Sequence, residues 1–394
     1  MQPKKVEAAT PADGICRATC SADVCTFTAK VDLYAGELGY YTFEECNGAI
    51  NPTLGMEVGK TYKFVQADRS NYYHPLGFAY FPDGAHADAD ELEPSIVPPG
   101  SDSNCGADMS CPAPMYLQGE EYLGTYSNDD TVAQVSSGED NFGLDDYEPK
   151  FFHPIPEWTS YGPFSISLKF DDEEYQQDIF YFCHIHQFMT GRIKLLKDDK
   201  PIQDKVDLPA LGYEYDSPSD FDKTCGTFGL DKFQLPYPEC PEKFVCDVPQ
   251  DNANLVQFSS CIDAMDCHMV AGMTTGVTAN SEKALFIHQM IPHHQNAVNM
   301  AKALLKTGSL ECDNLEDETD DCSLEVILRE IINGQNAQIQ AMQAILEGSN
   351  YPEEDDCKVD VSGNSSSPAA RPYILSIMSS IVISAVTYTL MYQI

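Results

Sequence analysis

The N-terminal half of the chain alternates apolar and polar residues with the period of a β-strand. Aromatic and β-branched side chains recur at every second position, and Gly and Asn-Pro steps separate the runs. This pattern predicts strands that are buried on one face. The predicted strands cover residues 26–31, 40–43, 61–65, 164–170, 178–182 and 192–196.

After residue 255 the hydrophobic period changes to that of a helix. The spacing predicts two long amphipathic helices, over residues 281–307 and 323–348, with Pro292 as their only internal proline. The chain is therefore expected to be a multidomain protein, all-β and then all-α.

Composition divides the rest of the chain into connecting segments. The expected organisation is a Cys-bearing leader (1–24), a β-domain (25–197) with a long insertion (82–160), a Pro/Cys-rich linker (198–254), a helical domain (255–350), an acidic and Ser-rich stalk (351–373) and a hydrophobic tail (374–394).

The tail from Ile374 to Met391 is apolar and uncharged, and only three residues follow it. Ser362, Gly363 and a polar spacer precede it, which is the order of a glycosylphosphatidylinositol attachment signal. A retained membrane helix is the alternative, because about 20 apolar residues suffice to span a bilayer. Either reading tethers the protein to the extracellular face of the cell membrane, although the N-terminal residues do not form a signal peptide.

Charge and cysteine content narrow the classes of partner. The formal net charge of −39 repels phosphate, which excludes nucleic-acid binding and favours cations. The 15 cysteines indicate a disulfide framework in an oxidising compartment, and the lack of a CxxC pair argues against a zinc ribbon. An odd total leaves one thiol, assigned to Cys183, and seven disulfides of open connectivity. The closely spaced candidate pairs are Cys105 with Cys111, Cys261 with Cys267, and Cys312 with Cys322.

The sharpest chemical motif is Cys183-x2-His186-x2-Met189, in the turn between two predicted strands. It brings a thiolate, an imidazole and a thioether into one short loop, as in a type 1 blue-copper site. A second histidine ligand must come from elsewhere in the chain, and His74 follows one predicted strand and precedes another. His86 and His153 are the alternatives, while His184 is expected to face away from the metal, because alternate residues of a strand point to opposite sides.

Over residues 25–197 the chain resembles the cupredoxin family, and its loop is similar to the short ligand loop of amicyanin. The resemblance implies a Greek-key β-sandwich with copper as cofactor, held by His74, Cys183, His186 and Met189. A multicopper oxidase is excluded, because Phe182 precedes the cysteine and nine histidines are too few for a trinuclear cluster as well.

A second set of copper-type ligands lies on the predicted helix 281–307. At 100° per residue, Met290, His293, His294 and Met300 share one face with small Ala297, which we expect to be buried and to leave room for an ion. Imidazole and thioether ligands together suit copper, and thioether suits Cu(I). Phe286 and Leu304 complete this face.

Further candidates with less support flank this helix. For the methionine stripe a Met-rich core with satisfied histidines is an equal alternative, since Met commonly fills gaps in cores. These candidates are Met265, His268, Met269, Met273, Gln335 and Met342.

Over residues 263–348 the chain resembles the ferritin-like domain of unknown function 305. Members of that family include copper-binding proteins, which implies a copper role here. The sequence departs from the family at Ala337-Gln338, where an acidic residue is usual, and it holds one copy of the helix motif. One copy gives too few helices for a closed bundle, so a homodimer through this domain is one expectation. The residues that carry the resemblance are Met290-Ile-Pro-His293-His294-Gln, Ala297, Met300-Ala301, Ile331-Ile332, Gln335, Ile339 and Met342.

These motifs favour a cell-surface protein for copper acquisition, storage or redox handling. The alternative is an electron-transfer cupredoxin that serves a membrane reductase through a redox partner protein. In that case the helical domain is purely structural. A surface interaction module with a vestigial copper site is a third reading, which the intact ligand loop disfavours. The sequence shows no paired carboxylates, activated nucleophile or phosphate loop, so copper binding and electron transfer are expected rather than dedicated catalysis.

Overall fold

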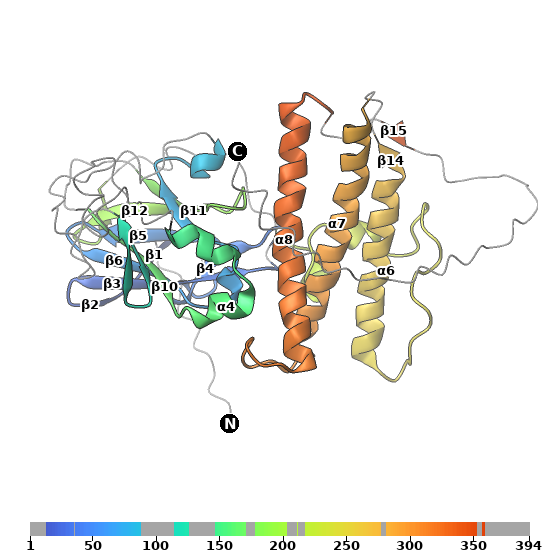
Figure 1. Ribbon diagram of the computed structural model, residues 1–394, viewed down its shortest axis with the longest axis horizontal. Helices are drawn as coiled ribbons and strands as arrows, with labels where there is room; N and C mark the ends of the chain where they lie inside the picture. Colours follow the sequence, from blue (N-terminus) through green and yellow to red (C-terminus); the bar gives the residue numbers. More distant parts are fainter. Residues whose placement is uncertain are drawn as a thin grey trace, which may run out of the picture. The chain divides into compact units, whose positions relative to one another are not determined.

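The computed structural model describes residues 13–34, 36–87, 114–125, 146–170, 178–202, 211, 217–276, 281–352 and 357–358. Within this part of the chain, an N-terminal β-sheet region is followed by a C-terminal helical region (Figure 1). Cys105, Cys111, the hydrophobic tail and most of the predicted stalk lie outside the described residues. None of the described helices combines the length and apolar character needed to cross a membrane.

The first sheet contains the strands that flank the Cys183 loop. Strand β5 (Thr53–Glu57) runs parallel to both of its neighbours in this sheet, and the other pairings are antiparallel. The strand order is β1 (Ile15–Arg17), β5 (Thr53–Glu57), β12 (Gly191–Lys197), β11 (Ile179–Cys183) and β7 (Leu76–Ala79), with β13 (Lys200–Pro201) paired to β12.

The second sheet is built around β3, which alternates half-buried and buried residues along its whole length, as the sequence predicts. The strand order is β2 (Thr19–Ser21), β3 (Val24–Asp32), β6 (Thr61–Gln66), β10 (Phe164–Lys169), β8 (Met115–Gln118) and β9 (Glu121–Thr125), with β4 (Tyr40–Phe43) paired to β3. The predicted insertion thus supplies β8 and β9 to this sheet, and the predicted leader supplies β1 to the first sheet and β2 to the second.

Aromatic side chains join the two sheets into one core. The rings of Phe64 and Phe78, one from each sheet, have centroids 4.8 Å apart, and those of Phe43 and Tyr181 are 5.2 Å apart. Edge-to-face and offset contacts of this kind stabilise a core beyond the area that they bury. The short helices of this region are η1 (Glu44–Cys46), η2 (Arg69–Asn71), η3 (Gly84–Ala87), η4 (Glu148–Phe152) and α4 (Ile155–Ser160).

Three long helices form the C-terminal region, and the central one packs against both others (Figure 1). They are α6 (Ala253–Met273), α7 (Glu282–Thr307) and α8 (Asp320–Gly348). Ser281 and Thr319 cap α7 and α8 by accepting from the backbone three residues on, and Gly308 ends α7 with φ +64°. The sequence prediction of the two helices 281–307 and 323–348 is confirmed to within three residues. Smaller elements are α5 (Asp220–Cys225), η5 (Asp231–Phe233), β14 (Thr275–Gly276) and β15 (Cys357–Lys358).

The disulfides of the described residues correct part of the predicted framework. Cys261 and Cys267 do not bond to each other, because positions six apart on α6 are about 9 Å apart along its axis. They instead bind the segment before α6, which the sequence analysis assigned to a linker. The described pairs are Cys16–Cys46, Cys20–Cys25, Cys225–Cys261, Cys240–Cys267 and Cys312–Cys322.

The prediction that Cys183 alone lacks a disulfide partner is also wrong. Cys246 and Cys357 carry free thiols as well, and both are exposed, whereas Cys183 is buried. With these three free thiols among the described residues, the 15 cysteines can form at most six disulfides.

Candidate metal centre

His74, Cys183 and His186 meet in the β-sheet region. Pairing of β7 with β11 sets Leu76 opposite Cys183, which brings the segment that carries His74 to the end of β11. His186 lies in the loop that follows β11. Cys183 Sγ is 3.6 Å from His74 Nδ1 and 3.7 Å from His186 Nδ1, and the two Nδ1 atoms are 3.1 Å apart. Among the described residues, this is the group of three His, Cys, Asp or Glu side chains that could hold a metal ion.

These separations fit a three-coordinate plane around one ion. Metal–nitrogen bonds of about 2.0–2.1 Å and a metal–sulfur bond of about 2.3 Å at 120° to one another separate the donor atoms by roughly 3.5–3.8 Å. The two sulfur–nitrogen distances fall in this range, and the nitrogen–nitrogen distance is slightly shorter. A small movement of either imidazole would accommodate a metal.

Burial controls the protonation of all three groups. Burial raises the pKa of the Cys183 thiol to about 12, so a thiolate requires a neighbouring positive charge. Burial, and then the charge of His86, lowers the pKa of His186 to about 3, and burial followed by the charge of His186 holds the pKa of His74 well below its usual range. Both imidazoles are therefore neutral and present a lone pair, as metal ligation demands.

A buried amide fixes the segment around His74. Gln66 Nε2 donates to the His74 carbonyl at 2.7 Å, and Gln66 Oε1 accepts from the Leu76 backbone at 2.9 Å and from the Tyr147 hydroxyl at 2.8 Å. Tyr41 donates a second hydrogen bond to the His74 carbonyl at 2.9 Å. The sequence pattern does not indicate these supporting residues.

The backbone of the loop is directed toward the sulfur. The His186 amide donates to Cys183 Sγ at 3.4 Å, and Thr190 Oγ1 donates to the Tyr181 carbonyl at 2.7 Å. Phe188 has φ +60°, a conformation that costs energy for a residue with a bulky side chain, so the surrounding contacts must hold the loop. Met189 is fully buried in the same core cluster as Cys183.

The other histidines of this region do not join the cluster. His86 donates from Nε2 to the Cys183 carbonyl at 2.9 Å, and His153 contacts Glu157 and Tyr161. The ring of His184 stacks on Phe182 and lies against Gly77, where an added Cβ would be 2.1 Å from His184 Nε2. Of the three upstream histidines that the sequence offers, the structure brings His74 to Cys183 and His186.

Residues of α8 also reach the loop, which the sequence did not indicate. With its amide oriented for hydrogen bonding, Gln340 donates to the Ile185 carbonyl at 3.1 Å and accepts from the Gln187 amide at 3.0 Å. Asn333 lies on the buried face of α8. Its hydrogen bonding opposes the fall that burial causes in the pKa of His74 and of His186.

The predicted buried face of α7 is wrong. Phe286 and Met300 are 58% and 38% exposed, and His293 is also exposed. The buried residues of α7 lie on two other sides because α6 and α8 both pack against this helix: they are Ala284, Ile287, His288, Pro292, Asn296, Val298, Ala301, Lys302 and Ala303.

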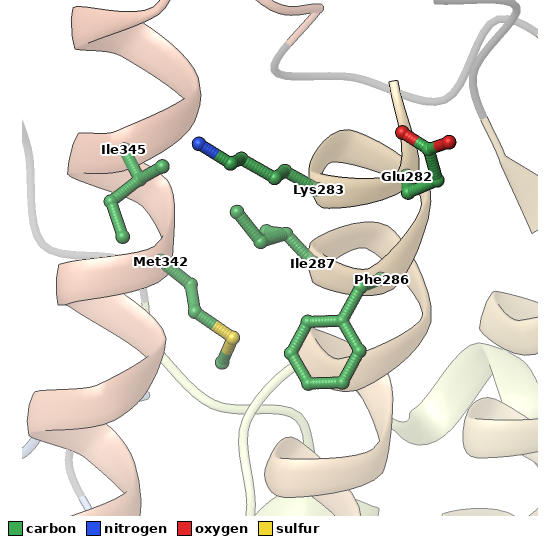
Figure 2. A pocket seen from close by; sticks show the side chains of 6 residues that line it. All are labelled: Glu282, Lys283, Phe286, Ile287, Met342 and Ile345. Carbon is green, nitrogen blue, oxygen red and sulfur yellow. The ribbon is translucent and has the colours of Figure 1, made fainter. Parts of the chain in front are cut away.

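His294, of the His/Met set predicted on α7, contacts protein groups on both sides of its ring. His294 Nδ1 lies 2.9 Å from the Met290 carbonyl and Nε2 lies 2.9 Å from Gln338 Oε1, so both ring nitrogens face protein partners. Figure 2 shows Met342 facing an apolar groove of about 390 Å³ between α7 and α8, together with Phe286 and Ile287. Met342 is thus part of a hydrophobic contact between α7 and α8.

The candidates on α6 have different surroundings. Met265 is buried beside the Cys225–Cys261 disulfide, and Met273 is 39% exposed. His268 packs on Phe233, with ring centroids 4.8 Å apart, and Met269 Sδ accepts from Asn296 Nδ2 at 3.3 Å. Gln335 Oε1 is a buried acceptor to which no described group donates.

Residues 259–346 and, in a second overlapping match, residues 286–373 match the family model of a domain of unknown function (DUF305). The helical region of this chain therefore contains a DUF305 domain, as the sequence resemblance indicates. No curated protein and no solved structure matches the chain.

Proposed function

We propose that the chain is a copper protein of the cupredoxin type, with a type 1 site formed by Cys183, His74, His186 and Met189. The observation that carries the proposal is the approach of one buried thiol and two neutral imidazoles to within 3.1–3.7 Å of one another. A thiolate and two imidazoles with a nearby thioether form the donor set of blue-copper centres. Bound copper would supply one-electron redox chemistry, and the chain would supply a site shielded from solvent.

The cellular role that fits this site is copper handling or electron transfer at the cell surface. The disulfides favour an oxidising compartment, and an excess of acidic residues favours cations near the protein. In such a protein, tethering would come from the hydrophobic C-terminal tail.

A second candidate is electron transfer alone, with a structural helical domain. The observation that favours it is the state of the predicted α7 set: His293 is exposed, and both ring nitrogens of His294 face protein groups. Acquisition or storage on the helices would instead require these side chains to rearrange around copper.

The first test is a spectrum and a metal count on the full chain. Addition of Cu(II) is expected to give an intense blue thiolate-to-copper band, with about one copper per chain at this site. Cys183→Ser should abolish the band, whereas Cys246→Ser, which changes an exposed thiol, should leave it intact. A further copper that is lost in His293→Ala but leaves the band unchanged would favour the storage role.

Zinc is the main competing occupant, since cysteine and histidine also ligate zinc well. A colourless protein that binds zinc and shows no blue band with Cu(II) would contradict the type 1 assignment.

A further inference from the structure

The centre is closed on its outer side by the helical region. His74 and His186 are both 0% exposed, although His186 lies in a connecting loop. Their Nδ1 atoms face Cys183, and among the described residues neither Nε2 atom has a hydrogen bond of good geometry. An Nδ1-ligated imidazole carries its proton on Nε2, so each ring needs an acceptor on that side.

Asn333 of α8 is a buried neighbour of His74 and His186. Asn333 Nδ2 already donates to the Arg329 carbonyl at 3.0 Å, which leaves Oδ1 as the acceptor. Asn333 is only 5% exposed, and a polar side chain so buried in a helix requires partners.

Gln340 lies about two turns further along the same helix. Its amide makes two hydrogen bonds with the backbone of the ligand loop, at Ile185 and Gln187 on either side of His186. Two bonds from one side chain fix both the position and the orientation of this loop segment.

The contact between α8 and the sheets also has apolar and charged anchors. Leu328 and Ile332 belong to the same core cluster as Cys183 and Leu76. Arg69 Nη1 donates to Glu325 Oε1 at 3.1 Å and to the Cys312 carbonyl at 3.2 Å. These contacts hold α8 in a fixed place relative to the cluster.

We propose that α8 is the outer wall of the Cys183 centre, in which Gln340 clamps the ligand loop and buried Asn333 closes the side of the two histidines. The inference rests on the proposed function for its copper part. It assigns the helical domain a direct role in the centre: α8 shields the ligand loop and restricts access to Cys183 from that side.

The closing experiment uses the full chain with Asn333→Leu, Gln340→Leu and, as matched control, Gln343→Leu, an exposed glutamine on the same helix. In the metal-free protein, labelling of Cys183 by N-ethylmaleimide is followed by peptide mass spectrometry, with exposed Cys246 as internal reference. Each wall variant should label Cys183 about tenfold faster, as expected for the loss of one hydrogen bond, with Cys246 unchanged. If Cys183 is labelled in the wall variants at the same rate as in the control, the proposal that α8 shields the centre is wrong.

The copper-loaded protein supplies the second readout. Loss of an outer group that orients a ligand typically weakens metal binding about 10–100-fold, so both wall variants should release copper to a chelator faster and shift the blue band. Unchanged release and spectrum would overturn the positioning roles. Absence of any blue band in the unsubstituted protein would overturn the proposed function instead, while the labelling result still decides the wall.

Discussion

Gln66 shows how one buried residue organises the candidate centre. Its amide bridges the His74 carbonyl, the Leu76 backbone and the Tyr147 hydroxyl, and the side chain is fully buried. The residues on both sides of the intervening Pro75 are thereby tied to β6. The orientation of His74 therefore depends on the side-chain amide of Gln66, which is not itself a candidate ligand.

Substitution Gln66→Leu keeps the volume but leaves several buried polar groups without their partner. Each such group costs about 1–3 kcal/mol, so we expect the free energy of unfolding of the metal-free protein to fall by about 2–4 kcal/mol. Urea unfolding measures this change. Gln234→Leu, at an exposed glutamine, is the control, and a Gln66→Leu protein as stable as that control would show that these bonds contribute nothing.

The sequence predicted the residues of the cluster better than it predicted their support. Cys183 and His186 share one loop, so their spacing alone indicates a common function. Gln66 lies in a strand and Asn333 in a helix. The residues next to them in the sequence do not indicate what either side-chain amide contacts. Their roles depend on tertiary packing, which places α8 against the ligand loop.

At the scale of elements, α7 differs most from its prediction. Periodicity correctly gave its length, but a helix between two others is buried on two sides, so a single apolar stripe does not describe it. Polar residues on those sides have distant partners: His288 Nε2 lies 2.8 Å from the Pro352 carbonyl, and Asn296 donates to Asp266 at 3.1 Å. The single-stripe interpretation therefore predicted the wrong buried face for α7.

Helix α6 is held by two disulfides to the preceding segment. The Cys225–Cys261 bond spans 36 residues and Cys240–Cys267 spans 27. Both cysteines of α6 are buried, on the side that faces residues 225–240. The segment assigned to a linker by its composition is thus part of the helical region.

Removal of the first of these bonds should destabilise the helical region. A disulfide that closes a loop of this length restricts the unfolded chain by about 4 kcal/mol, so Cys225→Ala/Cys261→Ala should lower the free energy of unfolding by an amount of that order. Non-reducing urea unfolding, followed by helical circular dichroism, tests this. Cys246→Ser serves as control, and a loss below about 1 kcal/mol would mean that packing alone fixes α6.

At the scale of the whole molecule, a buried lysine lies between the two regions in a chain with net charge −39. Lys302 of α7 is 1% exposed, and its Nζ donates to the Gly36 carbonyl at 3.1 Å and to the Glu37 carbonyl at 2.6 Å. Those carbonyls belong to the connection between β3 and β4. Residues 13–358, so far as they are described, form one compact unit, and this contact is among those that join its sheets to its helices.

The same lysine gives stability a pH dependence that can be measured. Burial lowers the pKa of Lys302 from 10.5 to about 8, against the opposing charge of Glu37. Between these two values the unfolded chain retains a proton that the folded protein has released, so stability rises with pH across this window and is lowest below pH 8. Lys302→Met removes this titration, while the other ionisable groups are common to both proteins.

We therefore expect the unsubstituted protein to gain on the order of 2–3 kcal/mol relative to Lys302→Met between pH 7.5 and 10. Urea unfolding of both proteins at several pH values within this range measures the difference. Loss of a donor to two carbonyls changes the offset between the proteins at every pH, but it does not change the slope. Parallel stability curves would mean that Lys302 keeps an ordinary pKa and is hydrated, in which case the contact between α7 and the β3–β4 connection opens in solution.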